Sequence, residues 1–241
     1  MRKIAVFAEG QTELVFVRAL ILNLIDCSKL SFECFELLRH SLSPQPYSYS
    51  SPNPEVHFMI IQVHGDEGVA SSIKEREKGL IERGYDVIYG IRDMYSEAYR
   101  MRSPCVIDNN LTREFTGSLL AVIQHMNYPQ KIKVFWAIME IEAWFLGMYN
   151  IFSKIDPKLT LANINSSLGI DLIHIDPEKE FYKPAKQICD IFALCGKTYD
   201  KKLRDIENIT SVMDVTDFND AMKNNRCACF SDFYNEINSY S

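Results

Sequence analysis

The sequence predicts an α/β protein, a mostly parallel sheet with helices on both faces and a helical cap formed by the C-terminal part of the chain. Two observations carry this prediction. In the first 150 residues, short apolar runs of strand length alternate with segments of helical periodicity, as in sheets built from strand–helix–strand units. After residue 150 the segments become short and amphipathic, and strand-like runs are nearly absent.

The first element is a buried strand. Residues 4–8 form a continuous apolar run, which is typical of a strand covered on both faces. Glu9 ends this run far short of a secretory core, so the pattern favours a strand over a signal peptide. Apolar residues at helical spacing then predict a helix over 14–25, with Gln11 or Thr12 available to cap its first turn.

The next segments predict two strands, an exposed loop and a helix. Residues 32–38 and 56–63 are strand-like, and the serine-rich stretch 41–54 between them contains four prolines, which favours an exposed loop or flap. A charged helix is expected over 69–83, and Gly84 follows it as a C-terminal cap.

The sheet continues with two further strands. Residues 85–91 are apolar and β-branched and end at Arg92-Asp93, and residues 131–139 form another strand that runs directly into Glu140. Between them, a helix is expected over 112–126 with Thr112 as its cap.

The C-terminal part predicts a helical region. We therefore expect an α/β domain over 1–150 and a helical region over 151–241 packed on it. The expected helices cover 160–168, 184–194, 199–208, 217–224 and 229–239.

Composition limits the class of protein. The chain has 241 residues, 47% of them hydrophobic, which is enough for a substantial core. Its 26 basic and 32 acidic residues give a net charge of -6, which excludes a histone-like mode of nucleic-acid binding but leaves room for a local basic groove. No stretch approaches the roughly 18 apolar residues of a membrane helix, so we expect no membrane partner.

The cysteines indicate a compartment. There are seven of them, an odd number without framework spacing, which favours reduced thiols in the cytoplasm. Cys227 and Cys229 invite a zinc interpretation, but no second ligand pair completes it, and buried thiols are favoured.

Acidic residues follow three of the predicted strands. Glu9 follows the first, Asp93 follows the strand 85–91, and Glu140 and Glu142 follow the last. The carboxyl ends of parallel strands lie along one rim, and carboxylates gathered there repel each other unless a cation compensates them. Mg²⁺ or Mn²⁺ is the natural partner. For any single position, an acid that caps the following helix is the better explanation; the three together favour a site.

Several motifs resemble a known family. Glu9-Gly10 followed by Thr12-Glu13 resembles the first motif of Toprim-type domains. Residues 139–146 are similar to a late motif of small bacterial and archaeal Toprim-like proteins related to the RloB and OLD-family nucleases, with Met139 where that group usually has His. Three further segments resemble C-terminal motifs of this group: Lys183-Pro184-Ala185-Lys186, Tyr199-Asp200-Lys201 and residues 229–233.

The resemblance implies a Toprim-like, Rossmann-type fold and a set of roles. Glu9 would be the Toprim acid, acting as metal ligand or general acid/base, Asp93 would stand in the aspartate motif, and Glu140 or Glu142 would supply the last acidic ligand. One departure concerns the aspartate motif, which is usually Asp-x-Asp but here reads Asp93-Met94-Tyr95, so that one carboxylate is missing unless Glu97 or Glu140 replaces it.

Phosphate binding is expected at four positions. Gly10 either lets backbone N–H groups approach a phosphate at the helix start or only permits a tight turn, and Thr12 stands beside it. Lys183 and Lys186 are the basic residues on which the resemblance falls.

The leading hypothesis is a Mg²⁺- or Mn²⁺-dependent nuclease that cleaves DNA or RNA, in a phage-defence or mobile-element system, with Glu9, Asp93 and Glu142 as catalytic residues. A second hypothesis is a non-catalytic or conditionally active partner of an ATPase, since the chain itself has no P-loop motif. A third is a phosphohydrolase acting on a small nucleotide. Assembly into a homo-oligomer stays open.

Overall fold

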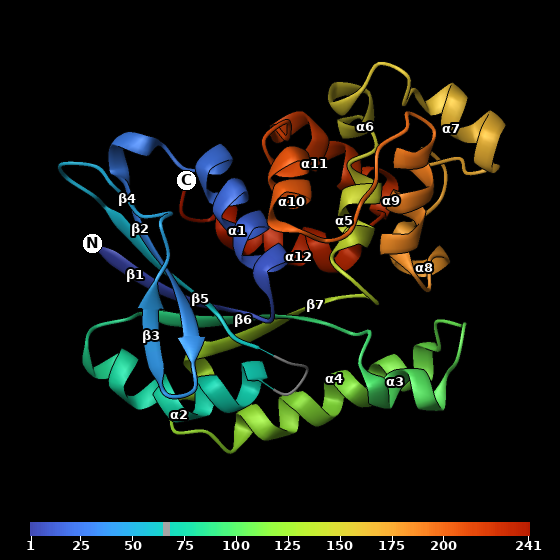
Figure 1. Cartoon of the computed structure of the whole chain (residues 1–241). Helices are drawn as coiled ribbons and strands as arrows, with labels where there is room; N and C mark the ends of the chain where they lie inside the picture. Colours follow the sequence, from blue (N-terminus) through green and yellow to red (C-terminus); the bar gives the residue numbers. More distant parts are fainter. Residues whose placement is uncertain (65–67) are drawn as a thin grey trace. The chain divides into compact units, whose positions relative to one another are not determined.

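A computed structural model describes residues 1–64 and 68–241 of the chain. In this described part, seven strands form one sheet in the order β3-β2-β5-β1-β6-β7, with β4 paired to β2 (Figure 1). The α/β prediction is confirmed, and the fold is Rossmann-like. The strands are β1 Arg2–Ala8, β2 Leu30–Leu38, β3 Ser41–Pro44, β4 Tyr49–Ser50, β5 Val56–Gln62, β6 Val87–Asp93 and β7 Ile132–Ala137.

The central strands of the sheet are parallel. β1 pairs in parallel with both β5 and β6, and β2 pairs in parallel with β5. Residues 4–8 of β1 are fully buried, as their continuous apolar run predicts for a central strand.

Two antiparallel strands lie in the segment that the sequence predicts to be a loop. β3 and β4 both pair antiparallel with β2, so the loop prediction for 41–54 was wrong in part. The strands are short and stand beside β2 at the edge of the sheet, where proline is tolerated because an edge residue needs no ladder hydrogen bond on its outer side.

The longer helices follow the predicted periodicity, whereas four short helices, α3, α5, α6 and α8, were not predicted from the sequence. The helices are α1 Gln11–Leu24, α2 Gly68–Glu82, α3 Glu97–Arg102, α4 Asn109–Gln124, α5 Glu142–Gly147, α6 Ile151–Ile155, α7 Leu161–Leu168, α8 Pro177–Glu180, α9 Pro184–Ala193, α10 Leu203–Thr210, α11 Val215–Met222 and α12 Ala228–Asn238, with short 3-10 turns at Cys27–Lys29, Pro129–Lys131 and Lys223–Asn225.

The chain divides into two compact units that interleave along the sequence. The first unit contains residues 1–92, 108–136 and 237–241, and the second contains residues 93–107 and 137–236. The sequence instead predicts one boundary, between residues 150 and 151.

In the first unit, helices cover both faces of the sheet. α1 lies on one face, and α2 and α4 lie on the other (Figure 1). α1 turns the apolar residues Leu14, Val17 and Ile21 inward, as their spacing predicts. Its N-cap is Gly10, without a side-chain cap, so the predicted capping by Gln11 or Thr12 was wrong.

The ends of α2 and α4 show how local residues set helix boundaries. Gly84 has φ +85° just beyond α2, the left-handed conformation expected of a C-terminal glycine. α4 begins three residues before the predicted start, because Asp108 rather than Thr112 is its cap: the Asp108 carboxylate accepts the N–H groups of Asn110 and Leu111 at 2.8 and 3.1 Å.

The second unit is built around the buried helix α5. Each residue of α5 is buried, and the helix packs against α8, α9 and α11. Residues 151–241, all of them described, contain helices and loops but no strand, as predicted. Among the described helices, none combines the length and the apolar character that crossing a membrane requires.

A buried arginine holds several segments of the second unit together. Arg226 is 5% exposed, and its guanidinium lies over the Tyr149 ring. An arginine carries five N–H donors in a fixed geometry, which lets one side chain satisfy many carbonyl groups that would otherwise be buried without partners. Arg226 donates to the carbonyl oxygens of Leu172, Ile173, Ile175, Gly147 and Asp220.

Candidate functional site

In the first unit, Glu9 lies directly after β1, as predicted. Its N–H donates to the carbonyl oxygen of Ile91 at 3.1 Å, and its side chain is 15% exposed. Arg92 Nε lies 4.0 Å from Glu9 Oε2, and the Arg92 guanidinium stacks over Trp136. Glu9 therefore has a cation beside it. Its convergence with the acids that follow the other strands stays a prediction.

In the second unit, the chain after β6 and the chain after β7 run side by side. Tyr95 N donates to the carbonyl oxygen of Met139 at 2.7 Å, and the Asp93 carboxylate accepts the N–H of Ile141 at 3.0 Å. Met139 has φ +63°, a left-handed conformation that is strained for a side chain of this size. Asp93 is thereby held against the segment that carries Glu140 and Glu142.

Lys201 joins the two glutamates. Its ammonium lies 2.6 Å from Glu140 Oε1 and 3.1 Å from Glu142 Oε1. Glu140 Oε2 accepts the N–H of Ala185 at 3.2 Å, in the first turn of α9. We call Asp93, Glu140, Glu142, Tyr199 and Lys201 the Lys201 cluster; all five belong to the second unit.

Glu142 is the most buried acid of this cluster, with 0% exposure. Burial raises the pKa of its carboxyl group, and the Lys201 charge opposes that rise. The Tyr199 hydroxyl donates to Glu142 Oε1 at 2.7 Å. Glu142 Oε2 has no hydrogen-bond partner among the described residues, which leaves a buried oxygen with its lone pairs unused.

Lys201 responds to the same charges. Burial alone would lower the pKa of its ammonium, but Glu142 and Glu140 raise it above its ordinary value, and Asp93 adds to the rise. The Lys201 ammonium is therefore charged at neutral pH. Its side chain remains 39% exposed, and its backbone is left-handed, with φ +57°.

The structure thus brings together three of the four predicted acids, Asp93, Glu140 and Glu142. Sequence reasoning assigned no role to Lys201 or to Tyr199. The available signal was the Tyr199-Asp200-Lys201 motif, which marks the segment but does not say which acids its side chains meet.

The residues predicted to bind phosphate lie in both units. In the first unit, Gly10 has an extended backbone that any residue adopts, and a Cβ there would come within 2.9 Å of the Glu13 carboxylate. Thr12 is half-buried in the first turn of α1. A side chain at position 10 would therefore require the end of the Glu13 side chain to shift, and phosphate binding at both positions stays a prediction.

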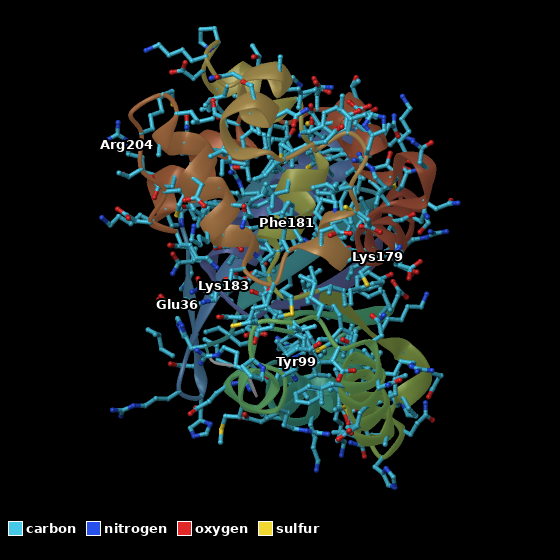
Figure 2. All side chains as sticks on the ribbon, turned by 90° about the vertical axis from the view of Figure 1, so that its right-hand side faces the viewer. Glu36, Tyr99, Lys179, Phe181, Lys183 and Arg204 are labelled. Carbon is cyan, nitrogen blue, oxygen red and sulfur yellow. The ribbon has the colours of Figure 1, made fainter. Side chains whose placement is uncertain are left out.

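In the second unit, Lys183 and Lys186 lie at the start of α9. Lys183 is exposed and directly precedes the helix, and Figure 2 shows it with Lys179 and Phe181 along the segment that leads from α8. Lys186 pairs with Asp190 at 2.5 Å on the exposed side of α9. Lys183 is the better placed of the two to receive an anion, because the Lys186 charge already has a partner.

The Lys201 cluster fits a divalent cation in its donor chemistry but not in its present arrangement. Carboxylate oxygens are the ligands that Mg²⁺ and Mn²⁺ prefer, and Glu142 Oε2 is an unused one. However, no group of three or more His, Cys, Asp or Glu side chains in the described part of the chain is placed to hold a metal ion. The Lys201 ammonium instead bridges the two glutamates.

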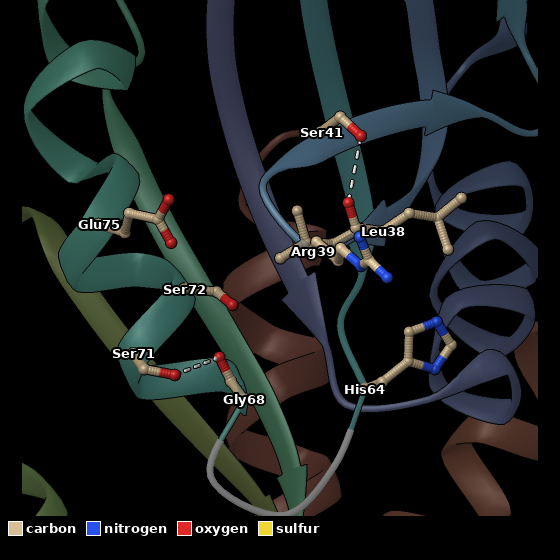
Figure 3. Close-up of a pocket in the computed structure, with 9 residues that line it drawn as sticks. Leu38, Arg39, Ser41, His64, Gly68, Ser71, Ser72 and Glu75 are labelled. Carbon is tan, nitrogen blue, oxygen red and sulfur yellow. Dashed lines mark hydrogen bonds between the residues drawn. The ribbon is translucent and has the colours of Figure 1, made fainter.

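The first unit contains a separate hollow of about 630 Å³, beyond the ends of β2 and β5 (Figure 3). Its acidic and imidazole groups already pair with neighbours: His64 with Glu36 at 2.9 Å, and Glu75 with His40 and Arg76. None of the predicted site residues lines the hollow. Its lining residues are Leu37, Leu38, Arg39, Ser41, His64, Gly68, Ser71, Ser72 and Glu75.

Comparison with protein-family models, with curated proteins and with solved structures gave no match to this chain.

Proposed function

We propose that this protein cleaves phosphodiester bonds of a nucleic acid with the help of Mg²⁺ or Mn²⁺. One observation carries the proposal: in the second unit, Asp93 at the end of β6 and the two acids that follow β7, Glu140 and Glu142, lie around Lys201. The pKa values of the Glu142 carboxyl group and the Lys201 ammonium are both raised, and shifted pKa values are enriched at functional sites.

The side chains of the cluster have distinct tasks in this proposal. Asp93, Glu140 and Glu142 supply the oxygen ligands for the metal. When bound, the metal would neutralise the phosphate and activate a water molecule. Lys201 supplies a positive charge that attracts phosphate oxygens, and the Tyr199 hydroxyl fixes the orientation of the buried Glu142 carboxylate.

Other parts of the proposal rest on the sequence. The Toprim resemblance supports nuclease chemistry, a role for Glu9 and a place in a defence or mobile-element system. The seven cysteines, all described, are free thiols, which supports a cytoplasmic location.

Labelled single- and double-stranded DNA and RNA, incubated with the purified protein and Mg²⁺ or Mn²⁺, test the proposal. We expect Asp93→Asn and Glu142→Gln to lower the cleavage rate about 100-fold or more, because each removes a proposed metal ligand. Asp217→Asn is the matched control: Asp217 is 1% exposed and also pairs with a lysine, Lys154, but lies outside the cluster. Equal rates for all three variants and the parent would remove the cluster from catalysis.

Glu9→Gln is tested in the same assay, independently of the cluster. A parent-like rate for this variant would remove Glu9 from the mechanism and leave the second-unit acids in place.

A second candidate function has a specific observation in its favour. Lys201 already neutralises Glu140 and Glu142, and this suits a non-catalytic or conditionally active partner of an ATPase. Absence of both cleavage and Mn²⁺ binding by calorimetry would support it. Turnover of mononucleotides instead of oligonucleotides would identify a small-nucleotide phosphohydrolase.

A further inference from the structure

We infer that the hollow of the first unit binds the phosphate group of a nucleotide-sized molecule, and that Arg39 and Ser72 hold this phosphate. The hollow measures about 630 Å³, and its lining residues lie on β2, β3 and α2 and in the adjoining segments, all within the first unit. No residue of the Lys201 cluster belongs to this unit, so the site is independent of the proposed nuclease activity.

Arg39 brings to the hollow a positive charge that no carboxylate neutralises. It stands between β2 and β3 with an exposed side chain, and it has no ion-pair partner among the described residues. Glu75, the acidic residue of the lining, pairs instead with Arg76 at 2.9 Å and with His40 at 3.2 Å. A guanidinium offers parallel N–H donors that match two oxygens of a phosphate, so a phosphate is the ligand expected beside Arg39.

Ser72 presents a hydroxyl to the same hollow. It is 7% exposed and lines the hollow, and its hydroxyl has no hydrogen-bond partner in the described part of the chain. Figure 3 shows this hydroxyl on the side of α2 that faces Arg39. Two other serines line the hollow, but both already donate to backbone carbonyl oxygens. Because polar groups on buried side chains normally have partners, a ligand oxygen in the hollow is the acceptor that Ser72 lacks.

The direction of α2 also favours an anion at this place. α2 begins at Gly68, one of the lining residues, and its first turn contains no acidic side chain. The N-terminal end of a helix carries a partial positive charge that attracts phosphate groups. Asp66 and Glu67 precede the helix in the sequence but lie outside the described residues, so we base the site on Arg39 and Ser72 rather than on the helix start.

The size of the hollow indicates a ligand larger than a free phosphate. Pockets for small molecules usually measure roughly 300–1,000 Å³, and the hollow lies within that range. Leu37 and Leu38 line the same space and offer apolar surface to a sugar or a base. Two sources carry such a phosphate, a free mononucleotide and the 5′-phosphorylated end of a nucleic acid.

Calorimetry of the full-length protein with adenosine 5′-monophosphate, in a buffer without phosphate and without divalent metal, tests the site. We expect saturable binding by the parent, because Arg39 and Ser72 both have donors to offer. Arg39→Gln should lower the affinity about tenfold, and Ser72→Ala about threefold, because a hydrogen bond to a charged group is stronger than one between neutral groups. Adenosine, which lacks the phosphate, should bind at least about tenfold more weakly than the monophosphate.

Matched variants control for charge and for the fold. Arg39→Lys keeps the charge but not the forked donors, and should recover only part of the affinity. Arg113 is also an exposed arginine of the first unit but lies on α4, outside the hollow, so Arg113→Gln should bind as the parent does. Ser71→Ala should lower the affinity less than Ser72→Ala, because the Ser71 hydroxyl already donates to the carbonyl oxygen of Gly68 at 3.2 Å. Circular dichroism checks the fold of each variant.

Two further probes identify the source of the phosphate. A single-stranded oligonucleotide with a 5′-phosphate that binds more tightly than both adenosine 5′-monophosphate and its own 5′-hydroxyl form would identify a nucleic-acid end. Affinity for the mononucleotide that equals or exceeds that of the phosphorylated oligonucleotide would identify a free nucleotide. Inorganic phosphate should bind more weakly than either, since it makes no contact with the apolar part of the lining.

Two results would overturn the site. The first is the absence of saturable binding of every one of these probes to the parent at millimolar concentration. The second is binding that Arg39→Gln and Ser72→Ala leave unchanged. Neither result bears on the nuclease, whose test is the cleavage rate of the Asp93→Asn and Glu142→Gln variants in the second unit.

Discussion

Two lysines of the second unit each bridge a pair of carboxylates, but the carboxylates of the two clusters make different further contacts. Lys154 contacts Asp214 at 2.8 Å and Asp217 at 2.6 Å, much as Lys201 contacts Glu140 and Glu142. In both clusters one acid is almost fully buried and has an oxygen without a hydrogen-bond partner among the described residues. Local charge and burial alone therefore do not separate a structural cluster from a functional one.

The difference lies in the backbone. Asp214 and Asp217 form a capping box at the start of α11: Asp214 accepts the N–H groups of Thr216 and Asp217, and Asp217 accepts the N–H of Asp214. The two carboxylates that Lys154 bridges therefore also cap the N-terminus of α11. The Lys201 cluster instead has a third carboxylate, Asp93, brought in from the end of another strand. This third acid is the feature that favours a site.

A buried glutamate that accepts hydrogen bonds from N–H groups instead of a lysine ammonium should give the largest change in the free energy of unfolding, and it serves as a reference for both clusters. Glu178 is 5% exposed and accepts N–H groups from Trp144, Cys229 and Phe230, and burial raises its pKa to about 7. The folded protein then binds this proton more tightly than the unfolded chain, so the free energy of unfolding falls as pH rises from about 4.5 to about 7. The expected loss is about 3 kcal/mol.

Urea unfolding of the parent and of Glu178→Gln at several pH values measures how much Glu178 contributes to the pH dependence of the free energy of unfolding. Glutamine does not titrate, so the stability difference should shift in favour of the variant as pH rises across that interval. A pH-independent difference would show that the hydrogen bonds to the Glu178 carboxylate cancel the effect of burial on its pKa.

Replacement of Lys201 should lower the free energy of unfolding by less than replacement of a fully buried charged side chain would. Lys201→Met leaves two carboxylates facing each other, and we expect the free energy of unfolding to fall by about 2 kcal/mol, below the value for buried pairs because the Lys201 side chain is 39% exposed. Mn²⁺ should restore the lost stability, because a ligand of the folded state stabilises it. Thermal unfolding with and without Mn²⁺ checks both effects.

Removal of Lys154 should have the smallest effect. Asp214 and Asp217 keep their N–H donors at α11, so Lys154→Met is expected to cost about 1 kcal/mol. Mn²⁺ should not restore its stability. Equal rescue of Lys154→Met and Lys201→Met would erase the distinction between the clusters.

The order of strands and helices could be predicted because buried positions show in the sequence as apolar runs or as apolar residues at helical spacing. Residues 4–8 are apolar throughout and form a central strand, and the spacing of Leu14, Val17 and Ile21 marks the inner face of α1. The sequences of β3 and β4 show no such apolar pattern. Their sequence is rich in serine and proline, and pairing with β2 rather than local preference makes them strands.

The candidate site was predictable in part. Asp93, Glu140 and Glu142 could be selected because each follows a strand, and strand ends collect at one edge. The part played by Lys201 could not, because it depends on a contact with Glu140 across 61 residues of chain. The start of α10 at Leu203, rather than at the predicted Tyr199, reflects the same feature: Lys201 is left-handed and precedes the helix instead of joining it.

The interleaving of the two units limits how this protein can be dissected. The chain passes from one unit to the other after residues 92, 107, 136 and 236. Tyr240, near the C-terminus, bonds to Tyr89 at 2.7 Å and packs on Phe58 within the first unit. Neither unit is therefore a continuous stretch of polypeptide, and a proteolytic cut or gene fragment ending near residue 150 would deprive both of segments they need. Reassembly from two co-expressed pieces is the more promising route to a split version.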